Sequence, residues 1–223
     1  MFIKRKKGEE KFEKIIKEKI AIRRHADYRM VYIVPASPIK SVIHFNKDMD
    51  TFIKSIEPNT LRFGNYQPIR DGGYYEYKSE FSVEITKEGL ICYRENWRQR
   101  DSTSEVKGDI MIDTSMIMLF QILRYAKKIY EKIGFYGNVI IGAEIYGTEN
   151  KVLFTTPNRM LSEEYSTTAK SVLVNQRFSY SEFENIYHAT YTIIEILLRS
   201  FKLVLDEKVL SEWISTLMTT VKE

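Results

Sequence analysis

The chain has 223 residues, of which 43% are hydrophobic and 29% charged, a balance that excludes a disordered chain and is typical of a folded globular protein. Its net charge of +4 permits an acidic partner without demanding one. One cysteine excludes an intramolecular disulfide, and no apolar run reaches the roughly 20 residues that span a bilayer, so we expect a cytoplasmic protein without membrane contact.

The first 24 residues carry a basic start and then a helical pattern. Residues 1–8, with Lys4-Arg5-Lys6-Lys7, predict a disordered tail, and residues 9–223 predict a single α+β domain. Within residues 9–24 the apolar side chains at helical spacing are Phe12, Ile15, Ile16 and Ile20. The stripe is narrow, so we expect this helix to pack against another surface.

Residues 28–97 are rich in strand signals. Residues 28–35 predict a strand, and residues 46–57 predict a short helix that Pro58 ends. Polar and apolar residues alternate from Tyr74 to Ile85, which predicts one half-buried antiparallel strand entered through a turn at Gly72-Gly73. Residues 90–96 then return as its partner.

The second half of the chain predicts helices on both sides of a hairpin. The polar residues 101–109 predict a loop, followed by a helix capped by Asp113 or Thr114 and ended at Gly134. Two strands flanking residues 148–150 predict a hairpin, and residues 169–178 predict a further strand. Residues 178–223 are helical, and Asp206 can cap the last helix. We predict an antiparallel-rich sheet with packed helices and a C-terminal helical pair.

One short motif has the acids and lysine of a metal-dependent nuclease. If Gly72-Gly73 forms a two-residue turn, Asp71 pairs with Tyr74, and Glu76 is its diagonal neighbour at about 7–8 Å. Lys78 points the same way and could polarise an attacking water. However, Glu80 and Glu84 lie on the same face, and no apolar residue there would enclose a catalytic pocket. An exposed charged strand is therefore the preferred interpretation, with the nuclease as an alternative.

The strongest binding signal is the sequence YRENWRQR at residues 93–100. Arginines can pair with phosphate and aromatic rings can stack on bases, so the patch is a candidate nucleic-acid surface. Its members are Tyr93, Arg94, Trp97, Arg98 and Arg100, with Arg62 and Arg70 as possible neighbours. A strand end with solvated or paired arginines explains the same pattern. The histidines lie on separate predicted elements, so we expect no metal site and no cofactor.

Three segments in order resemble one protein family. EKIAIRRHADYRMVYIVPASP, TLRFGNYQPIRDGGYYEY and GFYGNVIIGAEIYG are similar to the region that follows the Schlafen-type AlbA-like domain in bacterial and archaeal proteins. The resemblance covers residues 18–157. The AlbA-like domain itself has no counterpart here, so the family's nucleotide site is carried onto no residue. The chain is either part of a longer protein or a version that works without that domain.

The resemblance implies a role in a regulator- or defence-type protein. We expect a non-catalytic interaction module that docks a partner protein or a nucleic acid, with self-association through its first and last helices. The alternatives are a metal-dependent nuclease built on Asp71, Glu76 and Lys78, and a direct nucleic-acid binder that uses the patch at residues 93–100.

Overall fold

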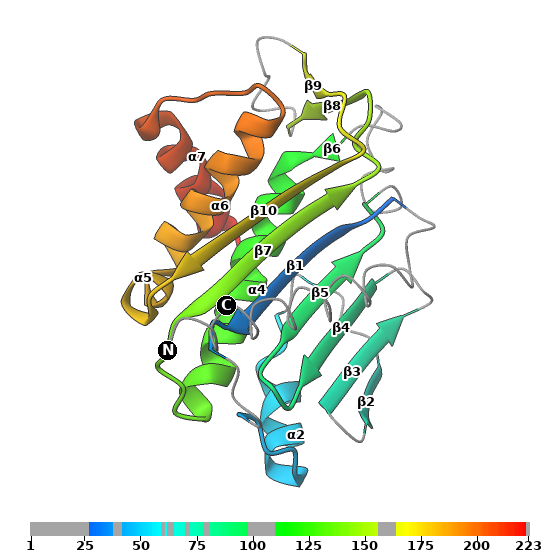
Figure 1. Cartoon of the computed structure of the whole chain (residues 1–223), viewed down its shortest axis with the longest axis vertical. Helices are drawn as coiled ribbons and strands as arrows, with labels where there is room; N and C mark the ends of the chain where they lie inside the picture. Colours follow the sequence, from blue (N-terminus) through cyan, green and yellow to red (C-terminus); the bar gives the residue numbers. More distant parts are fainter. Residues whose placement is uncertain are drawn as a thin grey trace, which may run out of the picture.

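A computed structural model of the chain describes residues 27–37, 42–58, 61, 65–69, 72–77, 81–97, 110–155 and 164–221 (Figure 1). The fold is α+β, as the sequence predicts: a large antiparallel sheet carries packed helices, and a small second sheet lies at one end. The predicted tail at residues 1–8, the helix at residues 9–24 and the loop at residues 101–109 lie outside the described residues.

In the part of the chain that the structure describes, the large sheet has seven strands in the order β10-β7-β1-β5-β4-β3-β2, and every neighbouring pair is antiparallel. β1 is near its centre, hydrogen-bonded to β5 on one side and β7 on the other. Strands β2 to β5 form a meander in sequence order. The strands are β1 (Arg29–Pro35), β2 (Asn65–Ile69), β3 (Gly72–Tyr77), β4 (Phe81–Thr86), β5 (Ile91–Glu95), β7 (Val139–Tyr146) and β10 (Ser171–Phe178).

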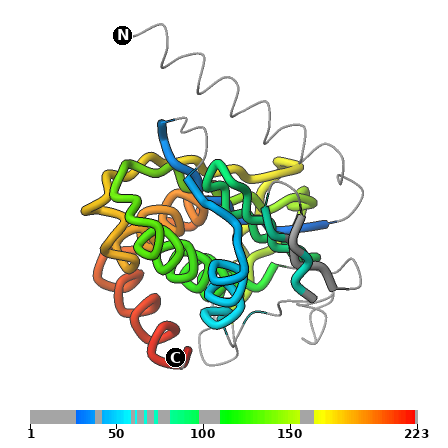
Figure 2. The backbone as a smooth tube through the Cα atoms, turned by 90° about the horizontal axis from the view of Figure 1, so that it is seen from below, coloured from blue at the N-terminus to red at the C-terminus, as the bar shows by residue number. Residues whose placement is uncertain are grey.

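All five helices that the structure describes lie on one side of this sheet, and we name the face on that side the first face (Figures 1 and 2). The opposite face is the second face. The helices are α2 (Lys47–Ser55), α4 (Ile112–Lys132), α5 (Tyr180–Glu184), α6 (Ile186–Ser200) and α7 (Glu207–Thr220). The predicted C-terminal helical pair is α6 and α7, preceded by the single-turn helix α5.

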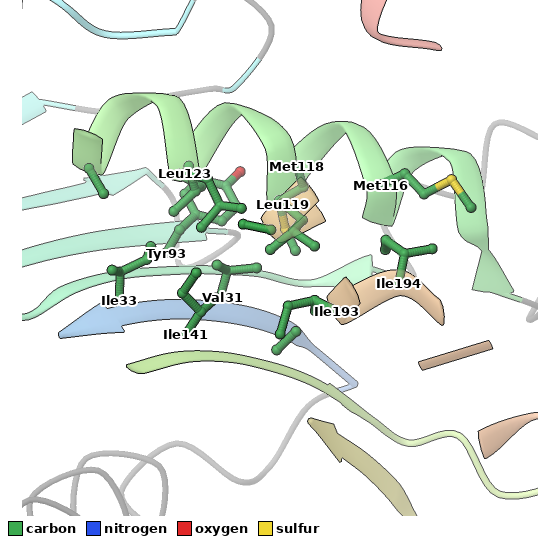
Figure 3. Packing of buried hydrophobic residues seen from close by; sticks show 14 of the residues in the cluster. Val31, Ile33, Tyr93, Met116, Met118, Leu119, Leu123, Ile141, Ile193 and Ile194 are labelled. Atoms are coloured by element: carbon green, nitrogen blue, oxygen red, sulfur yellow. The ribbon is translucent and has the colours of Figure 1, made fainter. Parts of the chain in front are cut away.

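The main core lies between the first face and the helices α4 and α6 (Figure 3). Val31 and Ile33 of β1 and Ile141 of β7 point toward Leu119 and Leu123 of α4, and all of them are buried. Each such side chain contributes about 1.5–3 kcal/mol by leaving water. α4 carries buried residues from Ile112 to Tyr130, so most of the helix packs into this core.

The predicted hairpin around residues 148–150 is wrong. A local turn does form there: the Lys151 N–H donates to the Thr148 carbonyl at 3.0 Å, and Asn150 has a φ of 58°. However, β7 pairs with β1 and β10, while β8 (Lys151–Phe154) pairs with β6 (Ile110–Met111) and β9 (Tyr165–Thr167) in the small sheet. The turn therefore moves the chain from one sheet to the other.

The predicted single strand from Tyr74 to Ile85 is also wrong, because the structure divides it into β3 and β4. These two strands pair with each other, with Tyr77 opposite Phe81. β4 also pairs with β5, as predicted for the strand that follows the turn at residues 87–89. The alternation continues through both strands because the pairing of Tyr77 with Phe81 keeps residues of the same parity on one face.

The predictions of helix ends at Asp206 and Gly134 are confirmed. Asp206 caps α7, with its side chain accepting a hydrogen bond from the Lys208 N–H at 2.9 Å, and Gly134 has a left-handed φ of 68° after α4. The predicted cap of α4 is wrong, because Met111 precedes its first residue and makes no side-chain cap bond. Asp113 instead accepts a hydrogen bond from Trp213 Nε1 at 2.7 Å inside the protein.

Replacing Trp213 by phenylalanine is expected to lower the free energy of unfolding by about 1.5 kcal/mol, because the buried Asp113 carboxylate loses an N–H donor. Urea unfolding followed by far-UV circular dichroism measures this value. The control is Trp213→Phe in an Asp113→Leu background, where the same change should cost less. Equal costs in the two backgrounds would show that the hydrogen bond does not stabilise the fold.

Candidate functional site

The structure buries the two aromatic rings of the predicted patch at residues 93–100. Tyr93 and Trp97 are both 0% exposed, and the indole Nε1–H of Trp97 donates to the Tyr146 carbonyl at 2.8 Å. Neither ring is therefore available to stack on a base. Arg94 lies on the opposite, second face and is half-buried. The other members of the patch lie outside the described residues: Arg62, Arg70, Arg98 and Arg100.

The alternation of side chains along β5 indicates from the sequence alone that Tyr93 and Trp97 lie on a different face from Arg94. Tyr93 and Trp97 share the parity of Ile91, and all three are buried on the first face. A strand places alternate residues on opposite faces, so Arg94 had to lie apart from both rings. The predicted patch therefore combined residues that are neighbours in the sequence but lie on opposite faces of the sheet.

The register of β2 and β3 contradicts the turn on which the nuclease geometry depended. Gly72 pairs with Ile69 and Gly73 with Pro68, so both glycines lie inside β3 rather than in a turn. Tyr74 pairs with Gln67 rather than with Asp71. Glu76 lies about 13 Å from Gly72 along an extended strand. Asp71 and Lys78 themselves lie outside the described residues.

Arg94 takes part in a row of side chains across the second face. Its guanidinium carbon lies 4.4 Å from the ring centroid of Tyr28, and the Tyr28 ring stacks on Tyr146 with centroids 5.3 Å apart and planes 7° apart. The Lys170 Nζ lies 5.6 Å from the Tyr146 centroid. The row thus places two stacked tyrosines between two cations. Arg94 belongs to β5 and Tyr146 ends β7, while Tyr28 and Lys170 lie one residue before β1 and β10.

One acidic group, Glu144, helps to hold the inner part of this row in place. The Tyr28 hydroxyl donates to Glu144 at 3.1 Å, and both side chains are buried. This hydrogen bond and the contact with Arg94 fix the Tyr28 ring. The outer part is more accessible, since Tyr146 is half-buried and Lys170 is exposed. A ligand would therefore reach the row from the β10 side.

The exposed part of the second face continues along β10. We define the β10 strip as Tyr146, Lys170, Leu173, Asn175 and Arg177. Leu173 is 51% exposed, and Asn175 and Arg177 are also exposed. Alternate residues from Leu173 to Arg177 share one face by strand geometry. The sequence from Lys170 to Arg177 contains no Asp or Glu, so its two ends are cationic and its middle is neutral.

A tyrosine from the centre of the sheet supports this strip from inside. The Tyr32 hydroxyl donates to the Asn175 side chain on β10, two strands away. Its ring crosses β7 at Gly142, where a Cβ would lie 2.0 Å from the Tyr32 Cζ. Gly142 is therefore needed for the close approach, and the contact fixes the Asn175 side chain within the strip.

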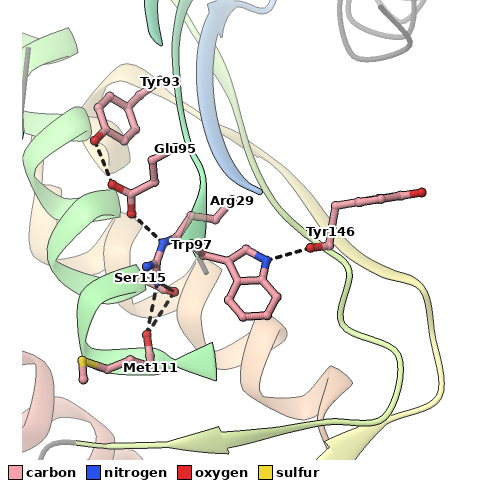
Figure 4. A network of polar contacts seen from close by, with 7 residues as sticks. All are labelled: Arg29, Tyr93, Glu95, Trp97, Met111, Ser115 and Tyr146. Atoms are coloured by element: carbon pink, nitrogen blue, oxygen red, sulfur yellow. Dashed lines mark hydrogen bonds and ion pairs between the residues drawn. The ribbon is translucent and has the colours of Figure 1, made fainter. Parts of the chain in front are cut away.

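A second polar cluster lies on the first face and is fully enclosed (Figure 4). Arg29 is 0% exposed, its Nε donates to Glu95 at 2.6 Å, and its guanidinium also reaches Ser115 at 2.9 Å and the Met111 carbonyl at 3.3 Å. The Tyr93 hydroxyl donates to the other Glu95 oxygen at 2.9 Å. The cluster joins β1 and β5 to the start of α4. We therefore assign it a role in stabilising the fold rather than in binding a ligand.

Tyr66 lies on β2, the edge strand farthest from β10, and its pKa is raised by its place in the fold. Burial raises the pKa of Tyr66, and the hydrogen bond to Asp50 raises it further, so the phenol remains a donor. The contact joins β2 to α2. Gly73 leaves space for this ring, since a Cβ there would lie 2.4 Å from the ring atoms. This contact stabilises the edge of the sheet.

Within the described ranges, no group of three or more His, Cys, Asp and Glu side chains could hold a metal ion. Among the helices that the structure describes, none is long and apolar enough to cross a membrane. Comparison of the chain with protein-family models, with curated proteins and with solved structures found no match. The resemblance to the region after the Schlafen-type AlbA-like domain therefore stays a prediction.

Proposed function

We propose that this chain is a non-catalytic interaction module of a regulator- or defence-type protein, and that it docks its partner on the second face of its large sheet. The observation that carries the proposal is the asymmetry of that sheet. All the described helices lie on the side of the first face, while the second face includes the β10 strip, of which Lys170, Leu173, Asn175 and Arg177 are exposed. A sheet face that offers exposed cationic and aliphatic residues beside a half-buried aromatic ring can serve as a contact surface.

The proposal predicts that binding depends on the face of the sheet. The paired change Lys170→Glu and Leu173→Glu alters the β10 strip, and Lys208→Glu with Val209→Glu is the matched change on α7, since all four residues are exposed. Tagged wild-type and variant chains are used to capture proteins and nucleic acids from cells. We expect partners to be retained by the wild type and the α7 variant and lost from the β10 variant.

Two results would contradict this function. The first is a captured set that is the same for all three chains, which would exclude the second face as the docking surface. The second is hydrolysis of DNA or RNA with Mg²⁺ or Mn²⁺ that disappears in Glu76→Ala, which would replace the interaction module with the nuclease alternative.

A further inference from the structure

We propose that the β10 strip binds single-stranded nucleic acid, with Lys170 and Arg177 contacting phosphates and Tyr146 stacking on a base. This inference deepens the proposed function and rests on it, since it names the ligand of the same face. It differs from the patch at residues 93–100 because its aromatic ring is Tyr146 of β7 rather than the buried Tyr93 and Trp97.

The first argument is the charge of the strip. Lys170 and Arg177 lie about 23 Å apart along an extended strand, and the residues between them carry no acidic group. A polyanion that follows β10 would meet a cation at each end. The acid nearest the middle is Glu144 of β7, opposite Leu173, and its side chain is buried and hydrogen-bonded to the Tyr28 hydroxyl. A strip of this length suits several nucleotides, within the 4–16 that one single-strand-binding domain covers.

The second argument is the position of the Tyr146 ring. One side of the ring stacks on Tyr28, which is fixed by Glu144 and Arg94, and the Lys170 ammonium lies 5.6 Å from the Tyr146 centroid. Lysine has a flexible stem, so its ammonium can move to a phosphate and leave space at the tyrosine ring for a base. The stack of Arg94, Tyr28 and Tyr146 would then support the bound base from below.

The third argument concerns the middle of the strip. Leu173 offers exposed apolar area, and the Asn175 side chain is fixed by Tyr32. Apolar contact and stacking accept any base, while a duplex would bury its base faces away from Tyr146. The strip therefore favours single strands over duplexes, with little dependence on sequence.

Fluorescence anisotropy of labelled oligonucleotides tests the proposal with the full chain. The probes are a 20-nucleotide poly(dT), a poly(rU) of the same length and a 20-base-pair duplex, each titrated from 50 to 200 mM salt. We expect the wild type to bind both single strands more tightly than the duplex. Lys170→Glu with Arg177→Glu should weaken binding at least tenfold, and Lys208→Glu should leave it unchanged.

The salt dependence of the binding constant is a second measurement on the same variants. Loss of two phosphate contacts should reduce the slope of log K against log salt by about 1.4 for a single strand. For Tyr146, leucine should weaken binding and phenylalanine should keep it, because only phenylalanine can still stack on Tyr28 and on a base. Circular dichroism at the binding temperature confirms that each variant is folded.

Three results would overturn the inference: no binding of either single strand at 50 mM salt, tighter binding of the duplex, or equal binding by Lys170→Glu with Arg177→Glu and by Lys208→Glu. If the chain bound no oligonucleotide but captured a protein through the β10 strip, nucleic acid would be excluded as the ligand. The proposed function would then stand. Absence of both would contradict both proposals.

Discussion

Replacing Arg29 by methionine is expected to lower the free energy of unfolding by about 3–5 kcal/mol. The Arg29 side chain is 0% exposed and neutralises a Glu95 side chain that is 4% exposed, so its loss leaves a carboxylate without its cation inside the protein. Methionine fills a similar volume, so little of the cost comes from a cavity. Urea unfolding, followed by far-UV circular dichroism, gives the free-energy difference.

The chain contains a matched control for this change. Arg199 on α6 pairs with Glu195 at 2.7 Å, nearly the same distance as the 2.6 Å of the buried pair, but its side chain is 60% exposed. Arg199→Met should therefore cost no more than about 0.5 kcal/mol. The double change Arg29→Met with Glu95→Leu should recover a large part of the loss, since it removes both charges. If Arg29→Met cost no more than Arg199→Met, the buried pair would not stabilise the fold.

Replacing Gly142 by alanine is expected to lower the free energy of unfolding by about 2–3 kcal/mol, in the upper part of the range for overpacking. The new methyl group would lie 2.0 Å from the Tyr32 Cζ and would force the ring away from β7. The ring would then lose its hydrogen bond to Asn175, on the β10 strip. Thermal and urea unfolding both measure the effect.

A double-mutant cycle identifies the cause of this loss. In a Tyr32→Ala background the methyl group meets no ring, so Gly142→Ala should cost less than about 0.5 kcal/mol. A cost of 2–3 kcal/mol in both backgrounds would mean that the alanine disturbs the backbone of β7 rather than Tyr32. The same variants also test whether a fixed Asn175 matters to binding on the second face.

The sequence predicted those parts of the fold that depend on local patterns. α2 and α4 follow from apolar periodicity, β1 and β10 follow from short strand-like runs, and Asp206 and Gly134 follow from the chemistry of helix ends. It did not predict which strands pair. The residues between Tyr77 and Phe81 contain no glycine or proline, so the boundary between β3 and β4 was not visible. The turn at residues 148–150 was visible, but a turn does not determine the sheet that the next strand joins.

The candidate site was only partly visible for the same reason. Arg94 was identified, yet its partners Tyr28, Tyr146 and Lys170 come from distant parts of the chain and meet only through the strand order. No local motif joins residues whose contact depends on long-range pairing. The patch at residues 93–100 was instead assembled from neighbours in the sequence, two of which point into the core.

The central position of β1 has a consequence for the order in which the protein folds. Contacts from its start reach Glu95, 66 residues later, and Glu144, 116 residues later. The meander from β2 to β5 uses short connections and can form as soon as it is synthesised, whereas β1 completes its pairing only when β7 is available as well as β5. We therefore expect the half of the sheet with β2 to β5 to assemble first. Insertion of β1 and β7 would then be the slow step that completes it.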